Sequence, residues 1–268
     1  MPRIALGIEY DGSAFCGWQT QPGGCAVQDA LERALAEIAG HAVATICAGR
    51  TDAGVHAVAQ VVHFDSDAVR PQSAWLRGVN ALLPAAVAVV WTHPVSDDFH
   101  ARYGASERRY RYLLLDQPVR AALNRKHVGW IHQKLEIEPM RAAANCLLGE
   151  HDFSAFRSSE CQANSPVREL RHLDINRRGD YVVFDLAGNA FLHHMVRNIV
   201  GSLVYVGAGR RPPQWLAELL AERDRSKGAP TMAAAGLYLA GVDYDPVFGL
   251  PQAPRRVWFN EGDHGDGS

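Results

Sequence analysis

The sequence has little that would bind a metal ion, a nucleotide or a membrane. Its five cysteines include no C-x-x-C pair, and their odd count predicts reduced thiols in the cytoplasm, against both a disulfide framework and a zinc site. Its glycines form neither a G-x-G-x-x-G nor a Walker pattern, which disfavours nucleotide binding. No run of about eighteen apolar residues occurs, and charge comes too early for a signal peptide, so no membrane role is expected.

The charges of the chain are distributed unevenly. A net charge of −2 over 268 residues points away from nucleic acid as a partner. Between Phe99 and Lys126, however, seven basic residues face two acidic ones, a local charge of +5. The run 108–112, Arg-Arg-Tyr-Arg-Tyr, interleaves arginine with aromatic rings as phosphate-binding and base-stacking surfaces do. A solvated strand face fits this run equally well. On the first interpretation, Arg108 and Arg111 are candidate RNA-binding residues.

Hydrophobic periodicity predicts the same order of elements twice. Residues 1–104 read as strand, helix, two strands, helix and strand, at 4–10, 26–39, 42–48, 58–64, 71–83 and 87–95. Residues 105–250 repeat that order, with strands at 110–115, 170–175, 181–187 and 237–242 and helices at 139–148 and 192–206, and add a further helix at 213–220 before the last strand. This β-α-β-β-α-β order is ferredoxin-like. We predict an α+β protein whose two halves join their sheets edge to edge around a central cleft, followed by a tail at 251–268.

The loop between the second and third predicted strands concentrates polar chemistry. It places Arg50, Asp52 and His56 within seven residues, beside Gly49 and Gly54. Glycine permits a positive φ or the close approach of a ligand to the backbone. In an extended segment, Arg50 and Asp52 project to the same side, so one could bind an anion while the other does chemistry. The alternative is a tight turn with an Asx-type hydrogen bond and a surface ion pair.

Other motifs receive structural interpretations. His193 and His194 are adjacent on a predicted helix, where neighbours point about 100° apart, and no third metal ligand is placed beside them. Packing or hydrogen bonding is therefore favoured over metal binding. Gly149 is expected to cap the end of the preceding helix. Trp18 is expected to anchor the first long loop.

Several motifs together resemble the TruA family of tRNA pseudouridine synthases. They are Gly-Arg-Thr-Asp-Ala-Gly-Val-His at 49–56, Asp-Phe-His-Ala-Arg at 98–102, the basic run at 108–112, Gly-Glu-His-Asp-Phe at 149–153 and His-His-Met-Val-Arg-Asn at 193–198. The resemblance implies the pseudouridine synthase fold and a cofactor-free, metal-free, homodimeric cytoplasmic isomerase. Its substrate would be uridine at positions 38–40, in the anticodon stem-loop of tRNA.

The same resemblance implies roles for individual residues. Asp52 matches the catalytic aspartate, Arg197 the arginine held against it, and Tyr110 the aromatic residue that stacks on the target base. Arg50 and Arg102 match arginines implicated in RNA contact and base flipping.

The chemistry of pseudouridine formation agrees with these roles. The reaction breaks the N1–C1′ bond, rotates the base and joins C1′ to C5, with no redox change and no added group. Attack at C6 of the base, attack at C1′ and abstraction of a sugar proton all use a carboxylate such as Asp52. Arg197 would keep that carboxylate ionised, and the base must leave its stack to be reached.

Two other functions remain as alternatives. A non-catalytic RNA-binding protein of two RRM-like halves would fit the fold, but neither half carries an RNP1-like aromatic strand motif. A glycosidase-type hydrolase would need a second well-placed carboxylate, which the sequence does not offer.

Overall fold

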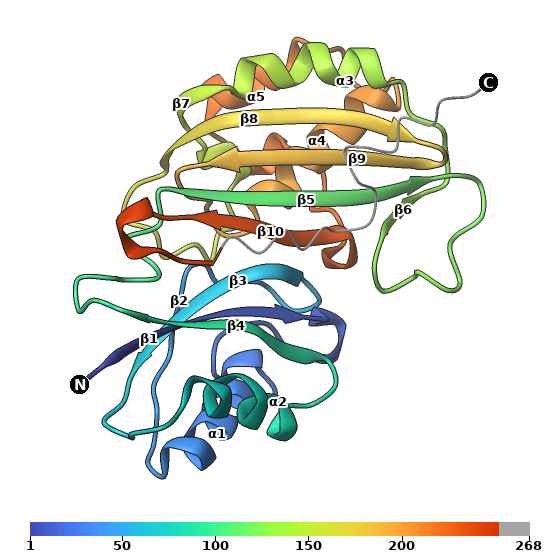
Figure 1. The fold of residues 1–268 in the computed structure, drawn as a ribbon. Coiled ribbons are helices and arrows are strands. Elements are labelled where there is room, and N and C mark those ends of the chain that lie inside the picture. The colour runs from blue at the N-terminus through green and yellow to red at the C-terminus, as the bar shows by residue number, and fades with distance from the viewer. Residues whose placement is uncertain (252–268) are drawn as a thin grey trace, which may run out of the picture.

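A computed structural model describes residues 1–251, and a single mixed sheet runs through it (Figure 1). The predicted tail at 251–268 lies outside the described residues except for Pro251. The strands are β1 (Arg3–Tyr10), β2 (Ile46–Cys47), β3 (His56–Asp65), β4 (Val87–Val95), β5 (Glu107–Asp116), β6 (Gly129–Ile131), β7 (Gly149–Asp152), β8 (Val167–Arg178), β9 (Tyr181–Gly188) and β10 (Leu237–Asp243).

The strand order confirms two ferredoxin-like halves joined edge to edge. The sheet runs β4-β1-β3-β10-β5-β9-β8-β7, with β2 paired to β3 and β6 paired to β5. The first half has the order β4-β1-β3-β2 and the second repeats it as β10-β5-β9-β8. Because β2 covers only Val62 and His63 of β3, the start of β3 is free to pair with β10 through His56 and Ala57.

The helices are distributed between the two halves. They are α1 (Val27–Ala39), α2 (Val79–Leu82), α3 (Ile137–Ala144), α4 (Met195–Gly207) and α5 (Trp215–Glu222). In Figure 1, α1 and α2 accompany the strands of the first half and the other three accompany the second. Among residues 1–251, every helix is too short or too polar to cross a membrane.

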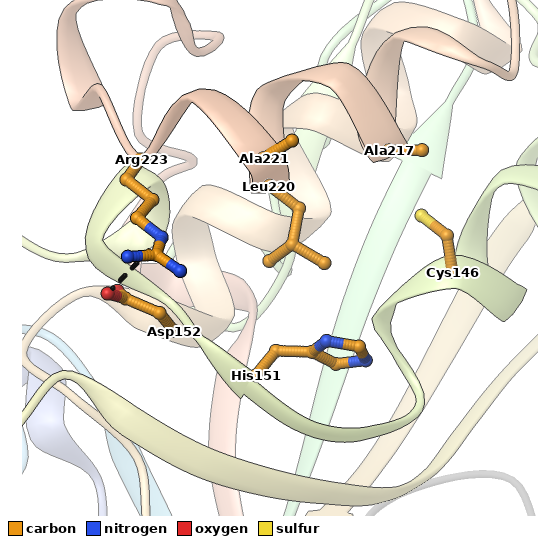
Figure 2. Close-up of a pocket in the computed structure, with 7 residues that line it drawn as sticks. All are labelled: Cys146, His151, Asp152, Ala217, Leu220, Ala221 and Arg223. Atoms are coloured by element: carbon orange, nitrogen blue, oxygen red, sulfur yellow. Dashed lines mark ion pairs between the residues drawn. The ribbon is translucent and has the colours of Figure 1, made fainter.

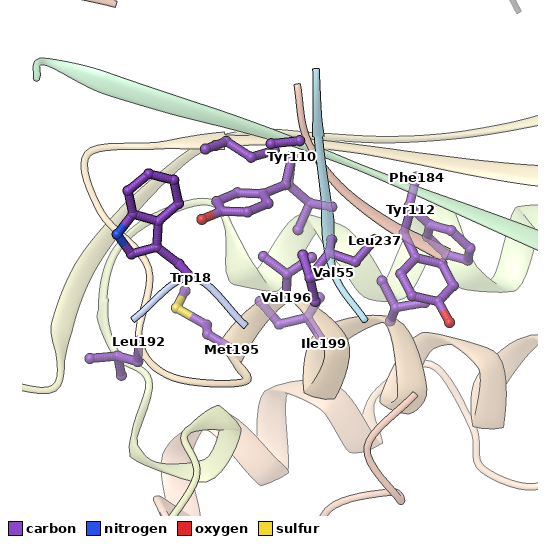
Figure 3. Close-up of a cluster of buried hydrophobic side chains, with 14 of the residues drawn as sticks. Trp18, Val55, Tyr110, Tyr112, Phe184, Leu192, Met195, Val196, Ile199 and Leu237 are labelled. Atoms are coloured by element: carbon purple, nitrogen blue, oxygen red, sulfur yellow. The ribbon is translucent and has the colours of Figure 1, made fainter. Parts of the chain in front are cut away.

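One hydrophobic cluster continues from the first half into the second. It contains Leu6 and Ile8 of β1 together with Ile199 and Leu203 of α4, all completely buried. Figure 3 shows Trp18 among side chains of the second half, including that of Met195. The halves therefore fold against each other as well as sharing a sheet, which holds the ends of β2, β3 and α4 in fixed positions.

The structure corrects several predicted elements. The strand expected at 42–48 is assigned as a strand only at Ile46–Cys47. The helix expected at 71–83 is present over residues 72–82, but it contains a π-helical turn, Ala74–Gly78, before α2. The strands β6 and β7 were not predicted. Gly149 does not cap a helix but opens β7, with φ +95° at the junction.

The expectation of reduced thiols is wrong for one pair of cysteines. Cys16 and Cys25 form a disulfide that closes the loop after β1, whereas Cys47, Cys146 and Cys161 are free. The two cysteines meet because the loop folds back on itself, with the Cys16 N–H donating to the Cys25 carbonyl at 3.1 Å. Their spacing along the sequence gives no sign of that reversal.

Candidate active site

The loop between β2 and β3 is held in place by buried polar side chains beneath it. Gln60 of β3 donates through Nε2 to the carbonyl of Gly49 at 2.6 Å, and its Oε1 accepts from the Gly49 N–H at 3.4 Å. The Tyr10 hydroxyl lies 2.8 Å from Oγ1 of Thr51. Both Gln60 and Tyr10 are almost completely buried, so they fix the backbone on the N-terminal side of Asp52.

The first long loop supports the same segment from another side. The backbone N–H of Trp18 donates to the Thr51 carbonyl at 2.9 Å, and the side chain is 1% exposed, which agrees with its predicted role as an anchor. Gly17, with φ +110°, approaches so closely that an added Cβ would lie 3.0 Å from the Thr51 oxygen. On the C-terminal side, Gly54 adopts φ +79°, the left-handed conformation that glycine was expected to provide.

Asp52 faces Arg197 across the joint between the halves. Nη1 of Arg197 donates to Oδ2 of Asp52 at 2.9 Å, and the two side chains are 15% and 22% exposed, with the arginine the more buried. Nε of Arg197 donates to the carbonyl of Met232 at 2.7 Å, which fixes the guanidinium on α4. The arginine therefore holds one carboxylate oxygen while the carboxylate stays open to solvent.

Two histidines lie against the Asp52 carboxylate. The sequence did not predict this contact. Nε2 of His193 lies 3.1 Å from Oδ1, and Nε2 of His194 lies 3.3 Å from Oδ2. They converge because α4 begins only at Met195, so the helical angle of about 100° expected for neighbours does not apply. Burial is the largest effect lowering the pKa of His194 below its usual value; Arg197 and His193 add to it, and Asp52 opposes it.

Tyr110 lies beside this group, on β5. Its ring is 8% exposed and meets Phe191 edge to face at a centroid distance of 5.0 Å. Burial is the main cause that raises the pKa of its hydroxyl, with Asp52 also raising it and Arg108 opposing. The hydroxyl forms no hydrogen bond with any residue from 1 to 251. The side chain thus offers a rigid ring close to the carboxylate.

The structure places Arg108 and Arg111 differently from the sequence expectation. The Arg108 guanidinium is buried and donates to the carbonyl oxygens of Ala48, Arg102, Ala105 and Asn189. Arg111 forms a two-point ion pair with Asp185, at 2.6 and 2.9 Å. Both guanidinium groups are therefore engaged by protein partners, and Arg108 has no free face for a phosphate.

Arg50 and Arg102 are the predicted site arginines that remain exposed. Arg50 forms no hydrogen bond or ion pair with the described part of the chain. The guanidinium of Arg102 lies over the exposed ring of Tyr103, 5.5 Å from its centroid. Both side chains are available to a polyanion, on segments that adjoin the Asp52 loop and the start of β5.

A separate surface pocket lies away from these residues. Figure 2 shows it between α5 and the segment that contains Cys146 and β7, with Arg223 paired to Asp152 at 3.5 Å at one end. None of the predicted site residues lines it. It is therefore distinct from the group around Asp52.

The paired ferredoxin-like halves and the shared aspartate–arginine contact define an enzyme-like site at the joint of one continuous sheet. The chain matches the tRNA pseudouridine synthase family over residues 7–104 and 143–245, and it belongs to that family. It is 57% identical to a tRNA pseudouridine synthase A of Thiobacillus denitrificans, over 96% of this chain and 98% of that protein. It is 61% identical to one of Chromobacterium violaceum, over 93% of this chain and 95% of that protein.

Proposed function

We propose that this protein isomerises uridine to pseudouridine in the anticodon stem-loop of tRNA, at positions 38–40. Membership of the tRNA pseudouridine synthase family supports the reaction class. The observation that carries the proposal is the Asp52 carboxylate, partly exposed and held by Arg197 at 2.9 Å. By its resemblance to the family, the enzyme acts as a homodimer in the cytoplasm.

Asp52 supplies the reactive carboxylate in this proposal. Because Arg197 occupies Oδ2, the charge of the carboxylate is partly balanced while its other oxygen can approach the substrate. That oxygen attacks C6 or C1′, or accepts a proton from the sugar. The reaction itself consumes no cofactor, since the new C1′–C5 bond replaces the broken N1–C1′ bond and the proton lost from C5 is matched by one gained at N1.

Tyr110 and the exposed arginines receive the RNA. The target uridine leaves its stack, because C1′ and C5 cannot be reached inside a helix. The Tyr110 ring then offers a stacking face, worth on the order of 1–3 kcal/mol for one base. Arg50 and Arg102 meet the displaced backbone, where exposed guanidinium groups pair with phosphate.

A tritium-release assay tests the proposal. Transfer RNA containing uridine tritiated at C5 is incubated with the protein, and tritium in water, free uracil and bound RNA are measured separately. A synthase releases tritium with no loss of base. Release of free uracil would indicate a hydrolase, and binding with neither product would indicate an RNA-binding protein.

A further inference from the structure

The carboxylate of Asp52 and the imidazoles of His193 and His194 converge like ligands around a metal ion. The carboxylate oxygens lie 3.1 Å and 3.3 Å from the two Nε2 atoms, and the three donor groups all lie within 4.8 Å of one another. In tetrahedral zinc coordination, bonds of about 2.0–2.1 Å to nitrogen and oxygen place neighbouring ligand atoms about 3.3 Å apart. The two observed contacts, from His193 to Oδ1 and from His194 to Oδ2, are each close to that value.

The backbone adopts a strained conformation that brings the two histidines together. His194 has φ 63°, and it is one of two non-glycine residues with positive φ among residues 1–251. A non-glycine residue in this region is strained by about 1 kcal/mol or more, and such strain concentrates at functional sites. Here it turns both imidazoles, whose centroids are 4.1 Å apart, toward one carboxylate.

The imidazole nitrogens are also available for coordination. Apart from their contacts with Asp52, neither ring forms a hydrogen bond or an ion pair with a residue in the described part of the chain. The side chains of Asp52, His193 and His194 are 22%, 35% and 27% exposed, so an ion can enter from solvent. Arg197 contacts Oδ2 only, which leaves Oδ1 beside His193 free of the guanidinium.

We propose that Asp52, His193 and His194 form an inhibitory site for a divalent cation of intermediate softness, such as Zn²⁺. Two imidazole nitrogens and one carboxylate oxygen are a ligand set that zinc accepts, with water in the fourth position. The bound ion occupies the oxygen that would otherwise react, so the enzyme is inactive while the ion is present. The binding stands by itself; the inhibition rests on the proposed function of Asp52.

A second group of similar composition provides a comparison. Asp11, His56 and His127 also lie close together. There, however, Nδ1 of His56 accepts from the Gly12 N–H at 3.1 Å and Nε2 lies 2.9 Å from the Lys126 carbonyl. Both nitrogens of His56 already have partners, so this group is less suited to an ion and serves as a matched control.

Direct binding of Zn²⁺ tests the site independently of activity. The metal-free protein is titrated with Zn²⁺ in competition with a chromogenic chelator, and Co²⁺ is used to record the visible spectrum of a tetrahedral complex. We expect one equivalent of tight binding in the wild type and in His127→Gln. His193→Gln combined with His194→Gln should bind on the order of 100-fold more weakly, at an unchanged melting temperature.

The activity arm uses the same proteins. In the wild type, tritium release should fall in step with zinc occupancy and return when a chelator is added. The proposed zinc site would be refuted if the wild type bound no stoichiometric zinc. It would also be refuted if binding were lost in His127→Gln and kept in the double variant. Full tritium release at saturating zinc would refute the proposal that the bound ion inhibits the enzyme. If the metal-free wild type releases no tritium, the proposed function fails while the binding result is still decided.

Discussion

Nη1 of Arg197 lies 2.9 Å from Oδ2 of Asp52, although the two residues are 145 positions apart in the chain. Asp52 precedes β3 in the first half and Arg197 lies on α4 in the second. The contact therefore crosses between the halves, which the pairing of β3 with β10 joins into one sheet. The strand pair and the common core together hold the halves in the relative position that this contact needs.

Substitution of Tyr110 separates its ring from its hydroxyl. Tyr110→Phe should keep tritium release near the wild-type rate, because the hydroxyl forms no hydrogen bond within residues 1–251 and a phenyl ring stacks equally well. Tyr110→Ala should lower kcat/KM by a factor equivalent to about 1–3 kcal/mol. Melting temperatures show whether the cavity left beside Phe191 also destabilises the fold. A Phe variant as inactive as the Ala variant would assign the function to the hydroxyl.

The arginines should divide into structural and RNA-binding groups. Arg108→Ala leaves buried carbonyl oxygens without a donor, so we expect the free energy of unfolding to fall by about 3 kcal/mol. Arg50→Ala combined with Arg102→Ala should leave unfolding unchanged but reduce the slope of log Kd against log salt, by about 0.7–0.9 for each phosphate that is no longer neutralised. Denaturant titration and filter binding at several salt concentrations measure the two effects. An unchanged slope in the double variant would remove both arginines from the RNA path.

His63 should make the protein sensitive to acid. Burial, assisted by the charges of Arg3 and His100 and opposed by Asp65, lowers the pKa of His63 from 6.5 to about 4. Between these values the unfolded chain binds the proton and the folded chain does not, so stability falls as the pH falls from 6.5 to about 4. The contribution is on the order of 3 kcal/mol.

Asparagine at position 63 provides the control for this effect. His63 accepts the Ala101 N–H through Nδ1 at 3.1 Å, and the side-chain oxygen of Asn can accept in its place without titrating. Free energies of unfolding measured from about pH 7 to pH 4 should therefore decline less in His63→Asn than in the wild type. Parallel pH curves would show that His63 is not the source.

Hydrophobic periodicity predicted most helices and strands, and the family resemblance predicted the contact between Asp52 and Arg197. Loop reversals and the exact ends of helices became visible only in the structure. Periodicity identified α1 and β4 closely because burial of one face repeats along each element. The pairing of Asp52 with Arg197 came from the resemblance to the family. The convergence of His193 and His194 escaped detection because it depends on where α4 begins, and Tyr10 and Gln60 read as ordinary strand residues. The disulfide depends on a loop conformation that spacing does not encode.

The most direct test of the central claim is tritium release by Asp52→Asn on tRNA labelled at C5. Asparagine keeps the size and the turn-forming ability of the side chain but removes the negative charge that reacts. With an unchanged melting temperature and equal or slightly tighter tRNA binding, release should fall by several powers of ten. Release near the wild-type rate, with deamidation back to aspartate excluded by mass spectrometry, would contradict the account.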